Sequence, residues 1–133
     1  MEARLEDVRL SFGNHRVINI ATLTFFHERV TAILGPNGSG KTTVLRLLAG
    51  LERPDMGQVL LDERPAVQAQ TSVGYAFQEA VFLTGTLRAN LDLALRLRGL
   101  SPDERTHRLI EAAEACGVTH LLARPAHRLS GGE

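Results

Sequence analysis

The sequence lacks tryptophan, has a single cysteine and contains no long apolar run. Because Cys116 has no second cysteine, an internal disulfide and a cysteine-based zinc cluster are both excluded. No stretch approaches the roughly 18 apolar residues of a membrane-spanning helix, and the segment 1–4 lacks the apolar core of a signal peptide. We therefore expect a cytoplasmic chain.

An excess of charge of one sign is missing as well. Fifteen Lys and Arg residues balance 15 Asp and Glu residues, so the formal net charge is zero and nothing indicates direct nucleic-acid binding. The five histidines are scattered without metal-ligand spacing. With 133 residues, 44% of them hydrophobic, the chain suits one modest globular domain, and any function must come from local motifs.

Short runs rich in β-branched and aromatic residues fill the N-terminal part, among them residues 17–20 and 22–26. These runs predict antiparallel strands. Residues 29–34 are too few for a helix and too apolar for a strand with one solvated face, so they predict a buried parallel strand. From Lys41 the apolar spacing becomes helical, and Gly50 stands where a left-handed helix end would need it.

The rest of the chain continues the alternation of strands and helices. Residues 58–62 and 73–77 predict two further strands. Thr86 can cap a helix of about three turns, and Ser101–Glu104 is typical of a capping box that opens another helix, which we expect to run to about Cys116. The order of elements predicts an α/β fold.

A glycine-rich loop carries the strongest chemical signal. Gly35–Thr42 matches the phosphate-binding pattern of glycine, four residues, glycine, lysine and a hydroxyl residue. Glycines let backbone N–H groups point at phosphate oxygens, and the following helix directs its positive dipole end to the same place. Lys41 adds a charge for the β- and γ-phosphates, and the Thr42 hydroxyl can ligate Mg²⁺. The loop therefore predicts a nucleoside triphosphate site.

Three motifs together resemble the nucleotide-binding domains of ATP-binding cassette (ABC) proteins, and the resemblance runs from about Leu5 to the last residue. Gln78 is similar to the family's Q-loop glutamine. Leu129–Glu133 is similar to the family signature, except that glutamate stands where glutamine is commoner. The remaining motif is the glycine-rich loop described above, which in the form typical of the family consists of Gly35, Pro36, Asn37, Gly38, Ser39, Gly40, Lys41, Thr42 and Thr43.

The resemblance implies the fold. It implies a P-loop nucleoside triphosphate hydrolase core with N-terminal antiparallel strands over residues 1–78. A helical subdomain up to the signature would follow over residues 79–133. The spacing between Gln78 and Ser130 leaves no room for the long coiled coil of the DNA-repair branches.

The resemblance also implies a role for each motif toward ATP and Mg²⁺. Phe12 matches the aromatic position that stacks on adenine. Gln78 matches the side chain that reaches Mg²⁺ and the attacking water. Ser130, Gly131 and Gly132 match the signature that closes over the γ-phosphate bound by a second nucleotide-binding domain, in a homodimer or a heterodimer.

Domains of this family are longer than the present chain. After the signature they continue with an apolar strand ending in aspartate, a glutamate that acts as the general base, and a switch histidine. In the family that strand pairs beside the strand leading into the phosphate loop, so we expect Val30–Leu34 to have an unpaired edge. We therefore expect a truncated N-terminal fragment that binds ATP without hydrolysing it.

Three functional hypotheses remain open. The first is an ABC transporter subunit that couples ATP binding and hydrolysis to transport, lies on the cytoplasmic face of the membrane and has transmembrane transporter subunits as partners. The second is a ribosome-associated ATPase of the translation-factor type, in which a Ser-Gly-Gly-Glu signature is common. The third is a non-functional remnant. The segment Phe82–Leu91 resembles transporters, whose membrane subunits dock on this surface, and we favour the first hypothesis. Import and export both stay open as the direction, and we favour import.

Overall fold

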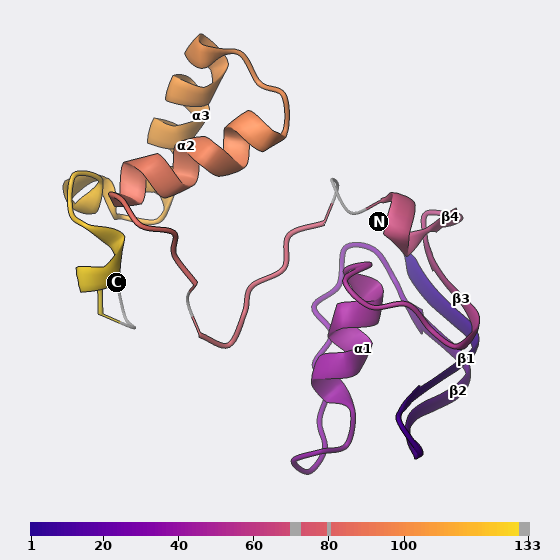
Figure 1. Ribbon diagram of the computed structural model, residues 1–133. Coiled ribbons are helices and arrows are strands. Elements are labelled where there is room, and N and C mark those ends of the chain that lie inside the picture. Colours follow the sequence, from indigo (N-terminus) through magenta and orange to yellow (C-terminus); the bar gives the residue numbers. More distant parts are fainter. Residues whose placement is uncertain (70–72, 80, 131–133) are drawn as a thin grey trace. The chain divides into compact units, whose positions relative to one another are not determined.

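The computed structural model describes residues 1–69, 73–79 and 81–130, and the chain divides into two compact units, Met1–Tyr75 and Ala76–Glu133. A sheet and one helix form the first unit, and two longer helices form the second (Figure 1). Among the described residues, no helix is both long and apolar enough to cross a membrane.

The first unit is built on an antiparallel sheet of four strands in the order β2-β1-β3-β4. β1 and β2 form a long hairpin around Gly13–Asn14, two residues suited to a tight turn. The predicted antiparallel strands are confirmed, although the runs at 17–20 and 22–26 join into one strand. The strands are β1 (Ala3–Phe12), β2 (His15–Phe25), β3 (Met56–Leu61) and β4 (Arg64–Pro65).

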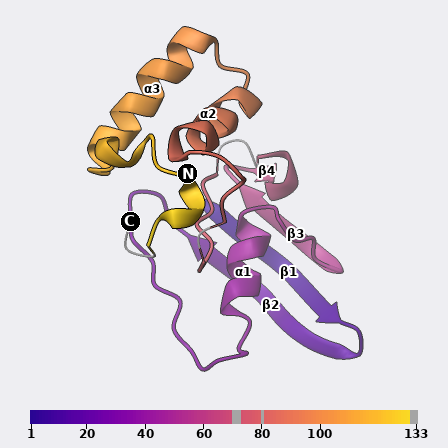
Figure 2. The ribbon, with the colours of Figure 1, turned by 60° about the vertical axis from the view of Figure 1, so that its left-hand side comes forward.

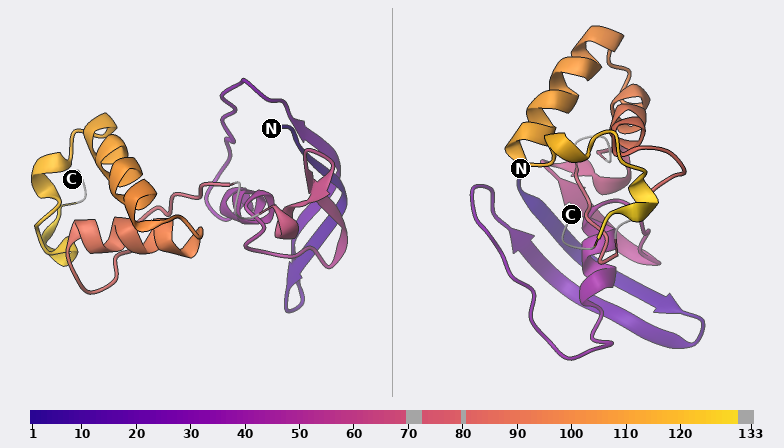
Figure 3. Two further views of the ribbon diagram at one scale, coloured as in Figure 1. Left: turned by 90° about the horizontal axis from the view of Figure 1, so that it is seen from above. Right: turned by 90° about the vertical axis from the view of Figure 1, so that its left-hand side faces the viewer.

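Helix α1 (Lys41–Leu48) covers one face of this sheet. Figures 2 and 3 show the sheet curving around the helix. Val44 and Leu47 lie three residues apart and therefore on one side of α1, where they join the buried sheet residues Leu5 and Val8. Gly50 ends the helix with φ 68°, as predicted. The core fixes the start of α1 beside the hairpin.

Helices α2 (Leu87–Leu97) and α3 (Pro102–Ala115) pack side by side in the second unit. Both begin as predicted. The Thr86 hydroxyl accepts the Ala89 N–H at 3.2 Å, and Ser101 with Glu104 completes the capping box. The core of this unit consists of Leu87, Leu109, Ala113, Leu121 and Leu122.

Short 3₁₀ turns complete the described chain: η1 (Ala66–Gln68) in the first unit, and η3 (Thr119–Leu121) and η4 (Ala126–Arg128) in the second. The segment around η4 is tied to the start of α2. Leu87 N–H donates to Arg124 O at 3.0 Å, and Ala126 N–H donates to Gly85 O at 2.9 Å. These bonds hold the chain that leads to Ser130.

Two of the predicted strands are wrong. Residues 29–36 form no regular structure, and Val30 and Leu34 are 103% and 90% exposed instead of buried. Residues 73–77 form no strand either, so Gln78 does not follow one. A parallel strand is held by hydrogen bonds to neighbouring strands. Within residues 1–69, 73–79 and 81–130, the strands pair only in the antiparallel sheet, and no strand lies beside either apolar run.

Candidate functional site

The glycine-rich loop leads directly into α1. The Ser39 N–H donates to Pro36 O at 3.3 Å, which turns the backbone, and Val44 N–H donates to Gly40 O at 2.9 Å, which begins the helix. The first backbone N–H groups of any α-helix have no partner inside the helix. Because Gly40 has no side chain to cap them, these N–H groups are suited to bind an anion.

Gly40 is required where the loop meets the hairpin. It is buried and has φ 85°, a left-handed conformation that other residues rarely adopt. A Cβ atom at this position would lie 2.9 Å from Cδ1 of Ile18 and 3.2 Å from the carbonyl oxygen of Val17. Strand β2 therefore packs directly against the end of the phosphate loop. The sequence pattern did not indicate this contact.

Lys41, the chain's only lysine, lies over the loop. Its Nζ donates to Gly35 O at 2.9 Å and to Pro36 O at 2.7 Å. The ammonium group is thereby held at the loop by neutral carbonyl oxygens. A phosphate oxygen carries negative charge and forms a stronger, charge-assisted hydrogen bond. The arrangement can pass the ammonium from the carbonyls to a phosphate.

The hydroxyl residues of the motif open α1. Thr42 is exposed and Thr43 is half-buried. A hydroxyl oxygen is a suitable ligand for Mg²⁺, which prefers oxygen donors and keeps several waters. In the described part of the chain, no group of three or more His, Cys, Asp or Glu residues could hold a metal ion. A loop of this kind fits Mg²⁺ together with the phosphates that the ion accompanies.

Phe12 ends β1 at the turn of the hairpin, and its side chain is 50% exposed. It pairs with His15, while Leu10, two positions earlier, pairs with Ile18. Ile18 is the residue beside Gly40, so Phe12 lies at the end of the hairpin that contacts the loop. An exposed aromatic ring there can serve as a stacking surface.

The other predicted site residues belong to the second unit. Gln78 and Ser130 are both exposed. Gly131 and Gly132 lie outside the described residues. The structure therefore brings together the residues of the phosphate loop, whereas Gln78 and the signature come from a separate unit.

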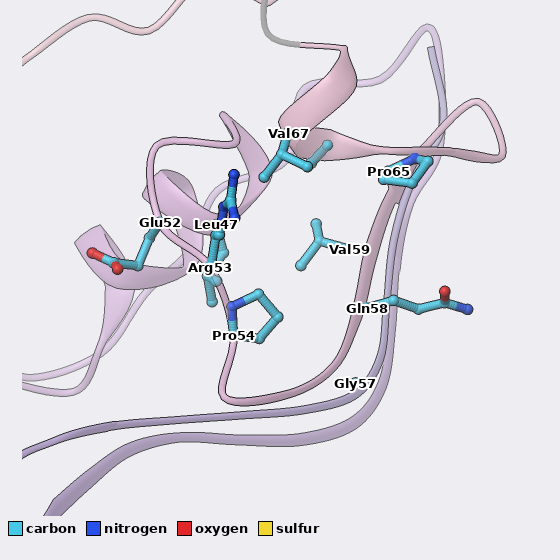
Figure 4. A pocket seen from close by; sticks show the side chains of 10 residues that line it. Leu47, Glu52, Arg53, Pro54, Gly57, Gln58, Val59, Pro65 and Val67 are labelled. Atoms are coloured by element: carbon cyan, nitrogen blue, oxygen red, sulfur yellow. The ribbon is translucent and has the colours of Figure 1, made fainter.

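A cavity of about 310 Å³ lies in the first unit between the end of α1 and β3. Figure 4 shows Pro54, Val59 and Val67 facing this hollow, while Glu52 and Gln58 point away from it. None of the predicted ATP-binding residues lines the cavity. Its walls offer mainly apolar contact, so it is separate from the phosphate loop.

Comparison with known proteins identifies the family. A family model described as ABC transporter matches residues 8–133. The tungstate uptake system ATP-binding protein TupC of Peptoclostridium acidaminophilum is 30% identical over 100% of this chain and 62% of its own length. The sulfate/thiosulfate import ATP-binding protein CysA of Thermosynechococcus vestitus is 36% identical over 100% of this chain and 41% of its own length.

A third relative, the spermidine/putrescine import ATP-binding protein PotA of Vibrio cholerae, is 37% identical over 98% of this chain and 36% of its own length. The chain thus spans between about a third and two thirds of these relatives.

A solved structure also matches. CbiO1 of Clostridium perfringens, part of the ABC transporter complex CbiONQ, superposes with a TM-score of 0.82 at 25% identity, over 98% of this chain and 56% of that one. This match confirms the predicted fold class, a P-loop core with antiparallel strands and a helical part. The family match over residues 8–133 spans all three motifs, and the chain belongs to the ABC transporter family.

Proposed function

We propose that this chain supplies the ATP-binding part of an ABC transporter's ATP-binding subunit, working in the import direction. The phosphate loop at the start of α1 carries the proposal, with Lys41 held over it by Gly35 and Pro36. The names of TupC, CysA and PotA, which are uptake or import ATP-binding proteins, support a transporter over the ribosome-associated alternative.

Each residue of the loop would bind a different part of ATP or its Mg²⁺ ion. The N–H groups around Gly40 would bind phosphate oxygens, and Lys41 would exchange its carbonyl partners for the β- and γ-phosphates. Thr42 would hold Mg²⁺, which neutralises phosphate charge when bound. Phe12 would stack on the adenine.

Gln78 and the signature would complete the site. We propose that Gln78 reaches Mg²⁺ and the attacking water. Ser130, Gly131 and Gly132 would face the γ-phosphate bound by a second nucleotide-binding domain, in a homodimer or a heterodimer. We also propose that residues 1–78 act as the P-loop core and residues 79–133 as the helical subdomain.

The helical subdomain would meet the transmembrane subunits, and the chain would then lie on the cytoplasmic face of the membrane. Support comes from an apolar groove of about 320 Å³ in the second unit, lined by the segment Val81–Leu83 and by α2. CbiO1, the solved structure that this chain resembles, is part of a transporter complex. An exposed apolar groove is typical of a protein interaction site.

Calorimetric titration with ATP and Mg²⁺ tests the proposal. Lys41→Ala removes the cation from the loop and is expected to weaken binding at least tenfold, because a charge-assisted hydrogen bond contributes about 1.5 to 3 kcal/mol. Arg46→Ala is the matched control, since Arg46 is an exposed cation on the same helix. Equal affinity of parent and Lys41→Ala, or no binding by the parent, would contradict the proposal.

A further inference from the structure

Two aspartates flank strand β3 and hold the two ends of β1. Asp62, directly after β3, donates its N–H to Glu2 O at 2.9 Å and accepts the Glu2 N–H on Oδ1 at 2.8 Å. Asp55, directly before β3, donates its N–H to Arg9 O at 2.8 Å and accepts the Ser11 N–H on Oδ2 at 2.8 Å. Each aspartate thus extends the hydrogen bonding of β1 past an end of β3.

The end of β1 that Asp55 holds is the weaker of the two. The pairing of β1 with β3 stops at Arg9. On the other side, the register with β2 shifts between Leu10 and Ser11, where Val17 is an extra residue of β2. Such a bulge disrupts the ladder of hydrogen bonds and bends the strand. A carboxylate accepts stronger hydrogen bonds than a neutral oxygen, so the bond from Ser11 to Asp55 restrains this end.

Phe12 directly follows the residue that Asp55 holds. Leu10 is 4% exposed and belongs to the core that the sheet shares with α1. Successive side chains of a strand point to opposite faces, so Phe12, two positions after Leu10, lies on the face that α1 covers. Its ring is 50% exposed and is therefore available for stacking. The direction of the ring depends on the backbone at Ser11 and Phe12, to which Asp55 is bonded on the β3 side.

We propose that Asp55 is a positioning residue, which holds the end of β1 so that the Phe12 ring meets the adenine of bound ATP. This inference rests on the proposed function, in which Phe12 stacks on adenine, whereas the hold on β1 rests on the contacts of Asp55. A purely structural alternative is that Asp55 only stabilises the edge of the sheet. In that case its loss would weaken the binding of every ligand of the phosphate loop equally.

Calorimetric titration of the full chain with two ligands, ATP and inorganic tripolyphosphate, each with Mg²⁺, separates the two roles. Tripolyphosphate lacks the adenine, so it reports binding to the phosphate loop alone. Phe12→Ala is expected to weaken ATP binding about tenfold, and Asp55→Ala about threefold or more, because a misdirected ring loses part of its stacking. Both variants should keep the tripolyphosphate affinity within about twofold of the parent, since the loop is unchanged.

Two further variants serve as controls. Asp55→Asn keeps a side-chain oxygen that can accept the Ser11 N–H, so it should restore ATP affinity to within about twofold of the parent. Asp62→Ala removes the same kind of bond at the other end of β1 and should change neither affinity. When Asp55→Ala is added to Phe12→Ala, no further loss of ATP affinity is expected, because the ring that Asp55 positions is gone.

The proposal would be overturned by unchanged ATP affinity in Asp55→Ala, by an equal loss of ATP and tripolyphosphate affinity in that variant, or by a further loss in the double variant. Unchanged ATP affinity in Phe12→Ala would overturn the stacking role and this inference with it. A parent that binds neither ligand would overturn the proposed function as well. A parent that binds both ligands and is matched by Asp55→Ala would count against this inference alone.

Discussion

The two units differ in how far their predicted elements form. In the second unit, both predicted helices form within the described residues, each with its predicted cap. In the first unit, the antiparallel sheet and α1 form, but the apolar run at 29–34 is without regular structure. The run at 73–77, which begins in the first unit and ends in the second, also forms no strand. The difference separates elements that find their partners nearby in the sequence from elements that need distant ones.

The range of the hydrogen bonds explains this difference. A helix closes each bond within four residues, and a hairpin brings two strands together across a short turn. Parallel strands need a connection of a dozen or more residues before they can pair. Residues 30–34 are apolar enough for a buried strand, yet no partner strand lies beside them in the described part of the chain.

The largest predicted effect is confined to the first unit. Gly57 has φ 79°, and a Cβ atom there would collide with the backbone carbonyl oxygens of Glu6 and Asp7. Gly57→Ala is therefore expected to lower the stability of the sheet by about 4 kcal/mol or more. Exchange of β1 amides should accelerate strongly, whereas amides of α3 should keep their protection.

Gly13→Ala is the matched control for that prediction. Gly13 also has a positive φ, 59°, but a Cβ atom there would meet nothing within 4 Å. Its cost should be limited to backbone strain, about 1 to 2 kcal/mol. Equal effects of the two substitutions would show that the close approach of β3 to β1 is unimportant. Parallel loss of protection in α3 would show that the two units do not unfold separately.

The second largest effect belongs to the second unit. Leu109 is 2% exposed in the core between α2 and α3. Leu109→Ala leaves a cavity and is expected to cost about 3 kcal/mol, measured by exchange of α2 and α3 amides. Leu97→Ala, at a 79% exposed position on α2, should cost little. The expected result reverses that for Gly57, with β1 now unaffected.

The sequence alone marks Gly35–Thr43 as the candidate site, and the structure forms the turn of the loop and the start of α1 that the pattern encodes. The roles of these residues toward ATP and Mg²⁺ stay predictions. The close contact between Ile18 and Gly40 could not be predicted from the sequence, since it depends on the register of strand β2. The two hydrogen bonds between the Asn90 side chain and the backbone of Leu83 could not be predicted either, because no residue pattern indicates them.

A smaller effect is expected at the capping box of α3, whose stability depends on pH. Hydrogen bonds from the hydroxyl and backbone N–H of Ser101 lower the pKa of Glu104 below its ordinary value, with a minor contribution from Arg108. A lowered pKa in the folded state means that the contribution to stability is present at neutral pH. It is lost as the pH falls through that lowered pKa.

Acidification should therefore loosen the first turn of α3, and Glu104→Gln should show less of this pH dependence because its side chain does not titrate. Amide exchange, corrected for its intrinsic pH dependence, measures the effect at the start of α3. If acidification changed amide exchange at the start of α3 equally in parent and variant, the capping box would not be the cause of the pH dependence.

The smallest predicted effect is the sharpest test of the comparison between the units. Leu34 lies in an apolar run that predicts a buried strand, yet its side chain is 90% exposed. Leu34→Ala should therefore change the stability of the first unit by no more than about 0.5 kcal/mol. Leu47→Ala, at a fully buried position of α1, should cost about 3 kcal/mol in the same denaturant titration. If the two costs were similar, the Leu34 side chain would be packed against other apolar side chains in solution, which would contradict this expectation.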